Sequence, residues 1–360
     1  MREESLRLLN AFTQAHGAPG AEGAVRKLFV RELAHLPASA DRVGNLYFDA
    51  SADAGDASGP RVMLTAHMDE VGFMVQDITA DGFLKFLPLG GWCENTLLAQ
   101  RVRVLTRAGR ELPGVITSLP PHFTGGDAKT SPAIDKLFID LGAESREQVG
   151  AWGVSLGDTI VPDGPFAPTA HPDRFLAKAF DNRSGCAALA QTLRLLKPGR
   201  PCRVLGVATV QEEMGCRGAQ TAAAIAAPDV ALVLEGPPAD DTPGFSRAES
   251  QGRLGGGVQI RLYDPSAIMN RELAEFARAT AERHGIPHQL TVRRSGGTDA
   301  KSIHLAGAGV PTIVLGVPAR YIHTHAALTD VRDFAACVNL TLALLDSLDA
   351  PTVAGFTKYL

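Results

Sequence analysis

An alternation of strand-like and helix-like segments, interrupted once, is the feature of this chain that most restricts its fold. Beyond residue 167, apolar runs of strand length such as CRVLGVATV and DVALVLEG alternate with helical patterns such as NRSGCAALAQTLRLLK. An earlier run, RVMLTAHMDE, has the same buried-strand character and begins before residue 70. This order predicts an α/β fold with a mostly parallel sheet flanked by helices.

The interruption spans residues 71–166, and its sequence pattern differs from that of the flanking segments. Short β-like runs, among them VGFMVQDI, GFLKFLPL and QRVRVLT, follow one another closely with Gly and Pro between them. That spacing predicts a small β-sandwich or barrel, and we expect an inserted β-barrel or PDZ-like domain. Residues 1–70 and 167–360 then form the α/β domain, and the turn-rich stretch LPPHFTGGDAKTSPA is expected to be a long mobile loop of the insert.

Charge and cysteine content exclude several classes of protein. The formal net charge of −4 offers no basic surplus for nucleic acid or an anionic membrane. No apolar run approaches the length of a membrane span, and the start MREESLRLLNAF is too charged for a signal peptide. Scattered cysteines with no C-x-x-C pair indicate buried thiols in a reducing cytoplasm, where we expect this protein to reside; they are Cys93, Cys186, Cys202, Cys216 and Cys337.

Acidic and imidazole side chains follow several of the expected strands. In an open α/β sheet, ligands bind beyond the carboxyl ends of the strands, so these side chains are expected to meet at one edge. They are His67 and Asp69 after RVMLTA, Glu212 and Glu213 after VATVQ, Glu235 in DVALVLEG, Asp181 after LAKAF, and His323 and His325 after PTIVLGVP. Such a cluster would repel itself without a cation, and mixed histidine and carboxylate ligands suit zinc, cobalt or manganese. The sequence therefore predicts a metal site.

Spacing suggests separate roles for neighbouring residues. In extended chain His67 and Asp69 share a face, as a ligand and a neighbour that orients it. Glu212 and Glu213 would point to opposite sides, so that a metal offsets Glu213 while Glu212 faces the substrate as general base. The ordinary alternatives are a satisfied strand-end histidine for His67, a solvated loop for Glu212 and Glu213, a turn cap for Glu235, and helix N-caps for Asp181 and Asp299.

Five motifs in this order closely resemble those of a known enzyme family: AHMDEVGFMV, AFDNRSGC, VATVQEEMGCRGA, SGGTDA and VPARYIHTH. The family is that of the co-catalytic metallo-aminopeptidases called tetrahedral, deblocking or glutamyl aminopeptidases, and the resemblance covers nearly the whole chain. It implies a zinc-exopeptidase-like catalytic domain with two divalent metal ions per subunit, zinc first and cobalt or manganese as alternatives. It also implies peptide substrates and a homo-oligomer, up to a hollow tetrahedral dodecamer, whose association the inserted β-domain supports.

Carried over residue by residue, the resemblance implies the ligands. Asp181 would bridge the two metals. His67 and Glu235 would complete one site, and Glu213 and His323 the other. The resemblance also implies that Glu212 is the general base and that Asp69 supports the first histidine; these two are the expected catalytic residues.

Two residues depart from the family pattern. Glu235 stands where the family usually has Asp, one methylene shorter, and is expected to alter metal affinity. Asn182 stands where another Asp is frequent and is expected to leave ligation intact.

Spacing does not choose between His323 and His325. The resemblance does, because the family's ligand follows Arg-Tyr and one apolar residue, which selects His323.

The implied reaction is removal of N-terminal residues from peptides, with metal-activated water as nucleophile and Glu212 moving the proton. Two alternatives are a related dinuclear hydrolase of deacylase or carboxypeptidase type and a non-catalytic, shell-forming peptide-binding protein. A glycosidase would instead need a working pair of carboxylates without the histidine set. Arg320 is near enough in sequence to be a candidate for binding an acidic N-terminal residue.

Overall fold

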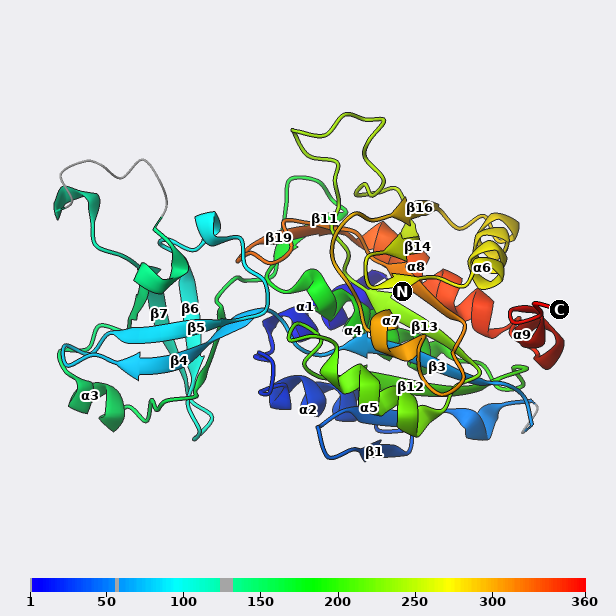
Figure 1. Cartoon of the computed structure of the whole chain (residues 1–360), viewed down its shortest axis with the longest axis horizontal. Coiled ribbons are helices and arrows are strands. Elements are labelled where there is room, and N and C mark those ends of the chain that lie inside the picture. The colour runs from blue at the N-terminus through cyan, green and yellow to red at the C-terminus, as the bar shows by residue number, and fades with distance from the viewer. Residues whose placement is uncertain (1, 56–57, 124–131) are drawn as a thin grey trace.

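The computed structural model describes residues 2–55, 58–123 and 132–360, which form two lobes (Figure 1). The larger lobe is built on a mixed sheet with helices on both faces, and the smaller lobe, at the left of Figure 1, is a closed β-barrel. Both ends of the chain lie in the larger lobe. The barrel is inserted between β3 (Arg61–His67) and β11 (Arg174–Ala177), so the chain leaves the larger lobe and returns to it.

Within the described residues the central sheet has nine strands, in the order β1-β2-β12-β3-β13-β17-β14-β15, with β16 beside β14. The inner strands β12, β3, β13 and β17 are parallel, whereas β2 and β14 flank them in antiparallel pairing. The carboxyl ends of the inner strands therefore meet at one edge. The remaining bounds are β1 (Ala38–Ala40), β2 (Leu46–Asp49), β12 (Arg203–Thr209), β13 (Val230–Glu235), β14 (Val258–Asp264), β15 (Ala267–Ile268), β16 (His288–Val292) and β17 (Thr312–Gly316).

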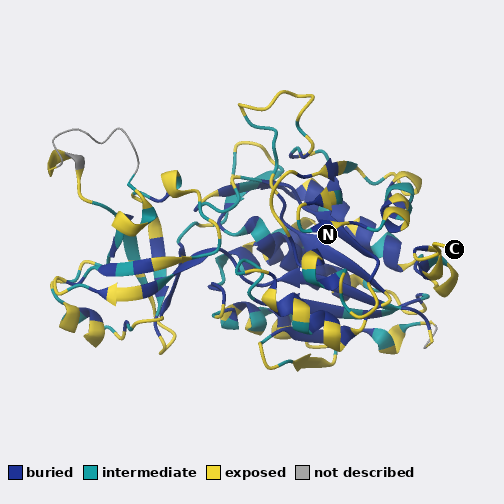
Figure 2. Cartoon of the chain, in the orientation of Figure 1, coloured by how far each residue is buried: buried dark blue, intermediate teal, exposed yellow. Residues whose placement is uncertain are grey.

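Successive side chains of the inner strands face two helical layers. In β3, Val62 and Leu64 join the larger core, whereas Met63 joins the smaller one. Because both faces are covered, these strands are apolar along their length instead of alternating, and Figure 2 shows them buried. The larger core includes α1 (Arg2–Gln14), α2 (Gly23–Glu32), α4 (Phe180–Leu195), α6 (Arg271–Arg283), α8 (Val331–Leu345) and α9 (Ala350–Gly355); the smaller includes α5 (Arg217–Ala226) and α7 (Ala300–Ile303).

The barrel has its own apolar core. Its strands close in the order β4-β5-β8-β7-β6-β9, and Phe73 packs against Phe86 and Trp92 inside it. These strands are β4 (Gly72–Ile78), β5 (Leu84–Leu89), β6 (Arg101–Leu105), β7 (Glu111–Thr117), β8 (Phe138–Asp140) and β9 (Thr159–Pro162), with α3 (Arg146–Ala151) beside them. A small sheet, β10 (Ala167–Pro168), β11, β19 (Ala327–Asp330) and β18 (Ala319–Arg320), follows the return to the larger lobe.

The predicted fold class, a parallel-rich α/β sheet with an inserted β-barrel, is confirmed. Residues 124–131, which belong to the loop predicted to be mobile, lie outside the described residues. No helix among the described residues is both long and apolar enough to cross a membrane. The prediction of buried thiols is wrong for Cys93, which is exposed in the segment between β5 and β6, and holds for the other cysteines.

A buried ion cluster lies where the two lobes join. The Lys178 ammonium contacts both carboxylate oxygens of Glu70, at 2.5 and 2.6 Å, and the Arg183 guanidinium lies 3.0 Å from the same carboxylate. All three side chains are at most 1% exposed. Arg183 also donates to the carbonyl of Phe12, within α1, and to that of Gly17, beyond the end of this helix. The cluster therefore ties α1, the end of β3, the end of β11 and α4 into one unit.

We expect Glu70→Gln to destabilise the fold by about 3–5 kcal/mol, because it leaves buried cations without their counter-charge. Urea unfolding measures this as a fall in the free energy of unfolding. Glu3→Gln, on the exposed face of α1, is the matched control and is expected to change little. Equal unfolding curves for the Glu70 variant and the unaltered protein would show that the cluster does not stabilise the fold.

Candidate metal centre

Strand register brings the first two side chains together. In β3, residues 63, 65 and 67 point to the side of the sheet opposite residues 62, 64 and 66, by the period of two. In the neighbouring parallel strand β13, Val233 pairs with Thr65. Continuing this register places Glu235 beside His67 on the same side, at the carboxyl ends of both strands. Local strand geometry therefore positions an imidazole against a carboxylate.

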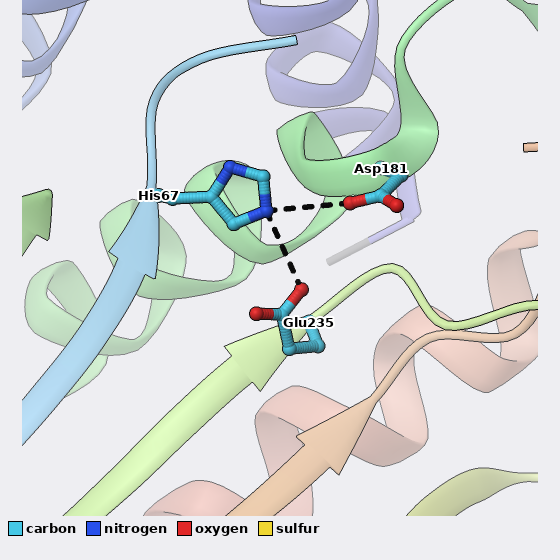
Figure 3. Close-up of side chains that lie close together, drawn as sticks. All are labelled: His67, Asp181 and Glu235. Atoms are coloured by element: carbon cyan, nitrogen blue, oxygen red, sulfur yellow. Dashed lines mark ion pairs between the residues drawn. The ribbon is translucent and has the colours of Figure 1, made fainter. Parts of the chain in front are cut away.

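Asp181 comes to these residues from the start of α4. Its backbone and that of Asn182 are not helical, although they lie in the first turn. The Asn182 side chain donates to the carbonyl of Leu234 and accepts from the Gly185 amide, which fixes this turn against the end of β13. Figure 3 shows the Asp181 and Glu235 carboxylates both directed at the His67 imidazole. The Nε2 atom of His67 lies 3.3 Å from Asp181 Oδ1 and 3.6 Å from Glu235 Oε2.

The second oxygen of Asp181 belongs to another cluster. Oδ2 lies 3.3 Å from His323 Nε2, and the same nitrogen lies 3.4 Å from Glu213 Oε1. Within each cluster the candidate ligand atoms lie within 4.8 Å of one another. One carboxylate thus joins two potential cation sites, each completed by one histidine and one glutamate.

Asp69 contributes differently from the sequence prediction. His67 Nδ1 is 3.1 Å from the backbone carbonyl of Asp69 and 3.5 Å from its carboxylate, so the hydrogen bond that orients the ring goes to the main chain. The Asp69 carboxylate instead accepts the backbone amides of Glu212 and Glu213, at 2.9 and 3.0 Å. This fully buried side chain therefore positions the segment that carries the two glutamates.

The premise that Glu212 and Glu213 lie in extended chain is wrong. β12 ends at Thr209, Gln211 adopts a left-handed conformation with φ 56°, and the two glutamates lie in the turn that leads to α5. The turn still separates them. Glu212 Oε2 lies 3.9 Å from His67 Nε2, whereas Glu213 lies against His323.

The electrostatics of the cluster favour positive charge. Burial raises the pKa of Glu213 and of Glu235, and burial with neighbouring carboxylates raises the pKa of Glu212 well above its ordinary value. Burial disfavours charge on the imidazoles, yet the facing carboxylates outweigh it and raise the pKa of His323 to about 11. The pKa of His67 is likewise raised, against burial, by Glu235 and Glu212.

Divalent cations fit this donor set. Imidazole nitrogen and carboxylate oxygen are the ligands that zinc accepts in proteins. Glu235 Oε1 is buried and has no hydrogen-bond partner within the described residues, which costs free energy unless a ligand completes it. Asp181 differs from the three glutamates, because the two imidazoles outweigh its burial and lower its pKa. It is therefore the carboxylate best suited to remain ionised between two cations.

The two histidines of RYIHTH are separated by the turn they occupy. They do not lie in extended chain, because residues 321–325 form a turn in which Tyr321 and His323 have φ near 60°. His323 points to Asp181. His325 is buried against Trp92, and neither ring nitrogen has a hydrogen-bond partner in the described part of the chain.

A cleft of about 720 Å³ opens beside the cluster. His67, Asp181 and Glu212 line it together with the SGGT segment at 295–298. Arg320 does not line it, because its guanidinium is paired with Asp241 at 2.6 Å, so its suggested role in binding an acidic residue is not supported. Two other cationic side chains do line the cleft: Lys301 and Arg261.

Sequence reasoning missed two residues of the site. Asp299 was interpreted as a helix cap, but its side chain makes no capping hydrogen bond and accepts instead from Thr209 at 2.5 Å. Cys216 was interpreted as an ordinary buried thiol, but its sulfur lies 3.3 Å from Glu212 Oε1. Both lie within motifs that the sequence does display, SGGTDA and QEEMGC, and their proximity depends on the packing of α7 beside α5.

Comparison with known proteins identifies the family of the chain. Residues 44–340 match the M42 glutamyl aminopeptidase family. The glutamyl aminopeptidase of Lactococcus lactis subsp. cremoris (strain MG1363) is 36% identical over 357 residues, 98% of each chain. The chain belongs to the M42 glutamyl aminopeptidase family, as the sequence motifs predicted.

Solved structures extend the likeness to the whole fold. The TET aminopeptidase from the marine sediment archaeon Thaumarchaeota archaeon SCGC AB-539-E09 superposes with a TM-score of 0.93 at 38% identity, over 99% of both chains. The TET1 peptidase of Pyrococcus horikoshii superposes with a TM-score of 0.85 at 31% identity, over 96% of this chain and 100% of that one. That peptidase can assemble into a tetrahedron or a large octahedral shell.

The geometry predicts different results for the two histidines of the turn. His323→Ala is expected to lose one metal ion per subunit in elemental analysis, because His323 alone supplies nitrogen to the second cluster. His325→Ala, the matched control, is expected to keep its full metal content and to lose at most about 10–100-fold in activity, the usual effect of an outer partner. Loss of metal from the His325 variant would show that the ligand is misassigned.

Proposed function

We propose that this protein is a dinuclear metallo-aminopeptidase that hydrolyses N-terminal residues from peptides. The observation that carries the proposal is the shared carboxylate of Asp181, whose two oxygens face two separate histidine-carboxylate clusters. In this proposal His67, Asp181 and Glu235 hold one ion, and Asp181, Glu213 and His323 hold the other. Zinc fits this nitrogen and oxygen set, and cobalt and manganese accept the same ligands.

When bound, such a metal pair lowers the pKa of a water and polarises the scissile carbonyl. Glu212 provides the proton transfer in the proposal. Its carboxylate borders the cleft and lies 3.9 Å from His67, beside the first cluster, and it belongs to neither of the two ligand sets. Its raised pKa suits a group that takes a proton from water and returns it to the leaving amine.

Asp69 acts as a positioning residue in this proposal. By accepting both amides of the Glu212–Glu213 segment, it fixes the general base relative to the ligand Glu213. Its carbonyl holds the tautomer of His67 that presents Nε2 to the cluster. One short segment after β3 thereby orients a ligand, a second ligand and the base.

Glu212→Gln is expected to keep both metal ions and to lose at least about 100-fold in turnover, because the amide preserves shape but cannot carry the proton. The measurement is release of p-nitroaniline from amino-acid p-nitroanilides, with metal content determined on the same sample. Chelation of the unaltered protein is expected to abolish the same activity, and metal addition to restore it. A fully metallated variant with near-normal turnover would remove Glu212 from the mechanism, and chelator-resistant hydrolysis would contradict metal dependence.

We also propose that the chain forms a homo-oligomeric shell through its barrel lobe. The support is the likeness to a peptidase that can assemble into a tetrahedron or a large octahedral shell, together with the separate core of the barrel, which leaves it free to serve as an association module.

Replacing residues 71–166 by a short Gly-Ser linker is expected to reduce a large assembly to small species in light scattering. Circular dichroism of the shortened chain provides the folding control. A folded, shortened chain that still forms the large assembly would contradict the role of the barrel.

A further inference from the structure

A third group of potential ligands lies on the far side of Glu212 from His67. Glu212, Cys216 and Asp299 each offer an atom within 4.8 Å of the others. The two oxygens of Glu212 face different neighbours: Oε2 lies 3.9 Å from His67 Nε2, and Oε1 lies 3.3 Å from Cys216 Sγ. Glu212 therefore stands between the proposed catalytic ions and a second set of donors.

Asp299 gives this group a carboxylate oxygen, a potential metal ligand, that has no hydrogen-bond partner among the described residues. Its side chain is fully buried, and Oδ2 accepts the Thr209 hydroxyl at 2.5 Å. The other oxygen, Oδ1, is buried without a hydrogen-bond partner among the described residues. A buried carboxylate oxygen left unmatched is costly, and no capping bond to α7 explains its position.

Cys216 gives the group its chemical selectivity. Its thiol contacts Glu212 Oε1 and the Thr298 carbonyl, each at 3.3 Å. Cys216, Glu212 and Thr298 all line the 720 Å³ cleft, so an ion in the cleft reaches them. Thiolate ligands select soft cations such as cadmium and zinc over magnesium, calcium or manganese.

We propose that Glu212, Cys216 and Asp299 form an inhibitory site for a thiophilic divalent cation, such as cadmium or zinc in excess. Binding replaces the thiol proton, which passes to solvent, by a metal–sulfur bond. It also engages the carboxylate of Glu212, which is then unable to accept a proton from water. The inhibition rests on the proposed role of Glu212, whereas the binding site itself does not.

The test is cadmium titration of the full-length, zinc-loaded protein. We expect one additional ion per subunit by elemental analysis, with the original zinc retained, and an ultraviolet thiolate-to-cadmium absorption band that rises with loss of peptidase activity. Cys216→Ser is expected to lose the band, the additional ion and the inhibition measured against its own uninhibited rate. Asp299→Asn is expected to weaken cadmium binding by about tenfold or more, since loss of even an outer partner has an effect of this size.

Cys93→Ser is the matched control, because Cys93 is an exposed thiol, and it is expected to behave like the unaltered protein. A band that persists in the Cys216 variant and vanishes in the Cys93 variant would overturn the proposal. Release of zinc in proportion to cadmium uptake would also overturn it, since inhibition would then arise by displacement. Near-normal turnover of Glu212→Gln would instead refute the inhibition, which rests on the role of Glu212, whereas the cadmium band and the additional ion in the unaltered protein would still establish the binding site.

Discussion

Mutual repulsion among buried carboxylates is the constraint on which the site depends. Asp181, Glu212, Glu213 and Glu235 converge on two imidazoles at the carboxyl edge of the sheet, largely out of contact with water. Without compensating charge, these carboxylates would move apart or take up protons. In the proposed function, two divalent cations shared by Asp181 would relieve this repulsion and leave Glu212 available for proton transfer.

The framework around the cluster is built to withstand that repulsion. Asp69 clamps the glutamate turn through two backbone amides, and Asn182 joins the start of α4 to the end of β13. One residue further along from Asp69, Glu70 begins the buried ion cluster with Lys178 and Arg183. The segment that follows β3 thus serves both the chemistry and the junction between the lobes.

The sequence could predict much of this arrangement, because strand ends carry a simple rule. His67 and Glu235 follow from the register of parallel strands, and the interruption of the α/β alternation locates the barrel. The turns could not be predicted. Gln211 and His323 adopt left-handed backbone conformations that non-glycine residues seldom show, so their local chain is not extended as spacing suggested.

Contacts between residues far apart in the sequence could not be predicted either. The pairing of Arg320 with Asp241 removes Arg320 from the cleft, and the two residues are far apart in sequence. Asp299 meets Cys216 and Glu212 only through the packing of α7 beside α5. Local patterns predict which side chains reach an edge of a sheet, but tertiary contacts decide which of them are already satisfied.

Anomalous X-ray diffraction from crystals of the zinc-loaded protein tests the central claim most directly. Two peaks are expected about 3.5–4 Å apart, on either side of the Asp181 carboxylate, the separation typical of two-metal hydrolytic sites. One peak should lie against His67 and Glu235 and the other against Glu213 and His323. A single ion, or ions that do not contact Asp181, would contradict that claim.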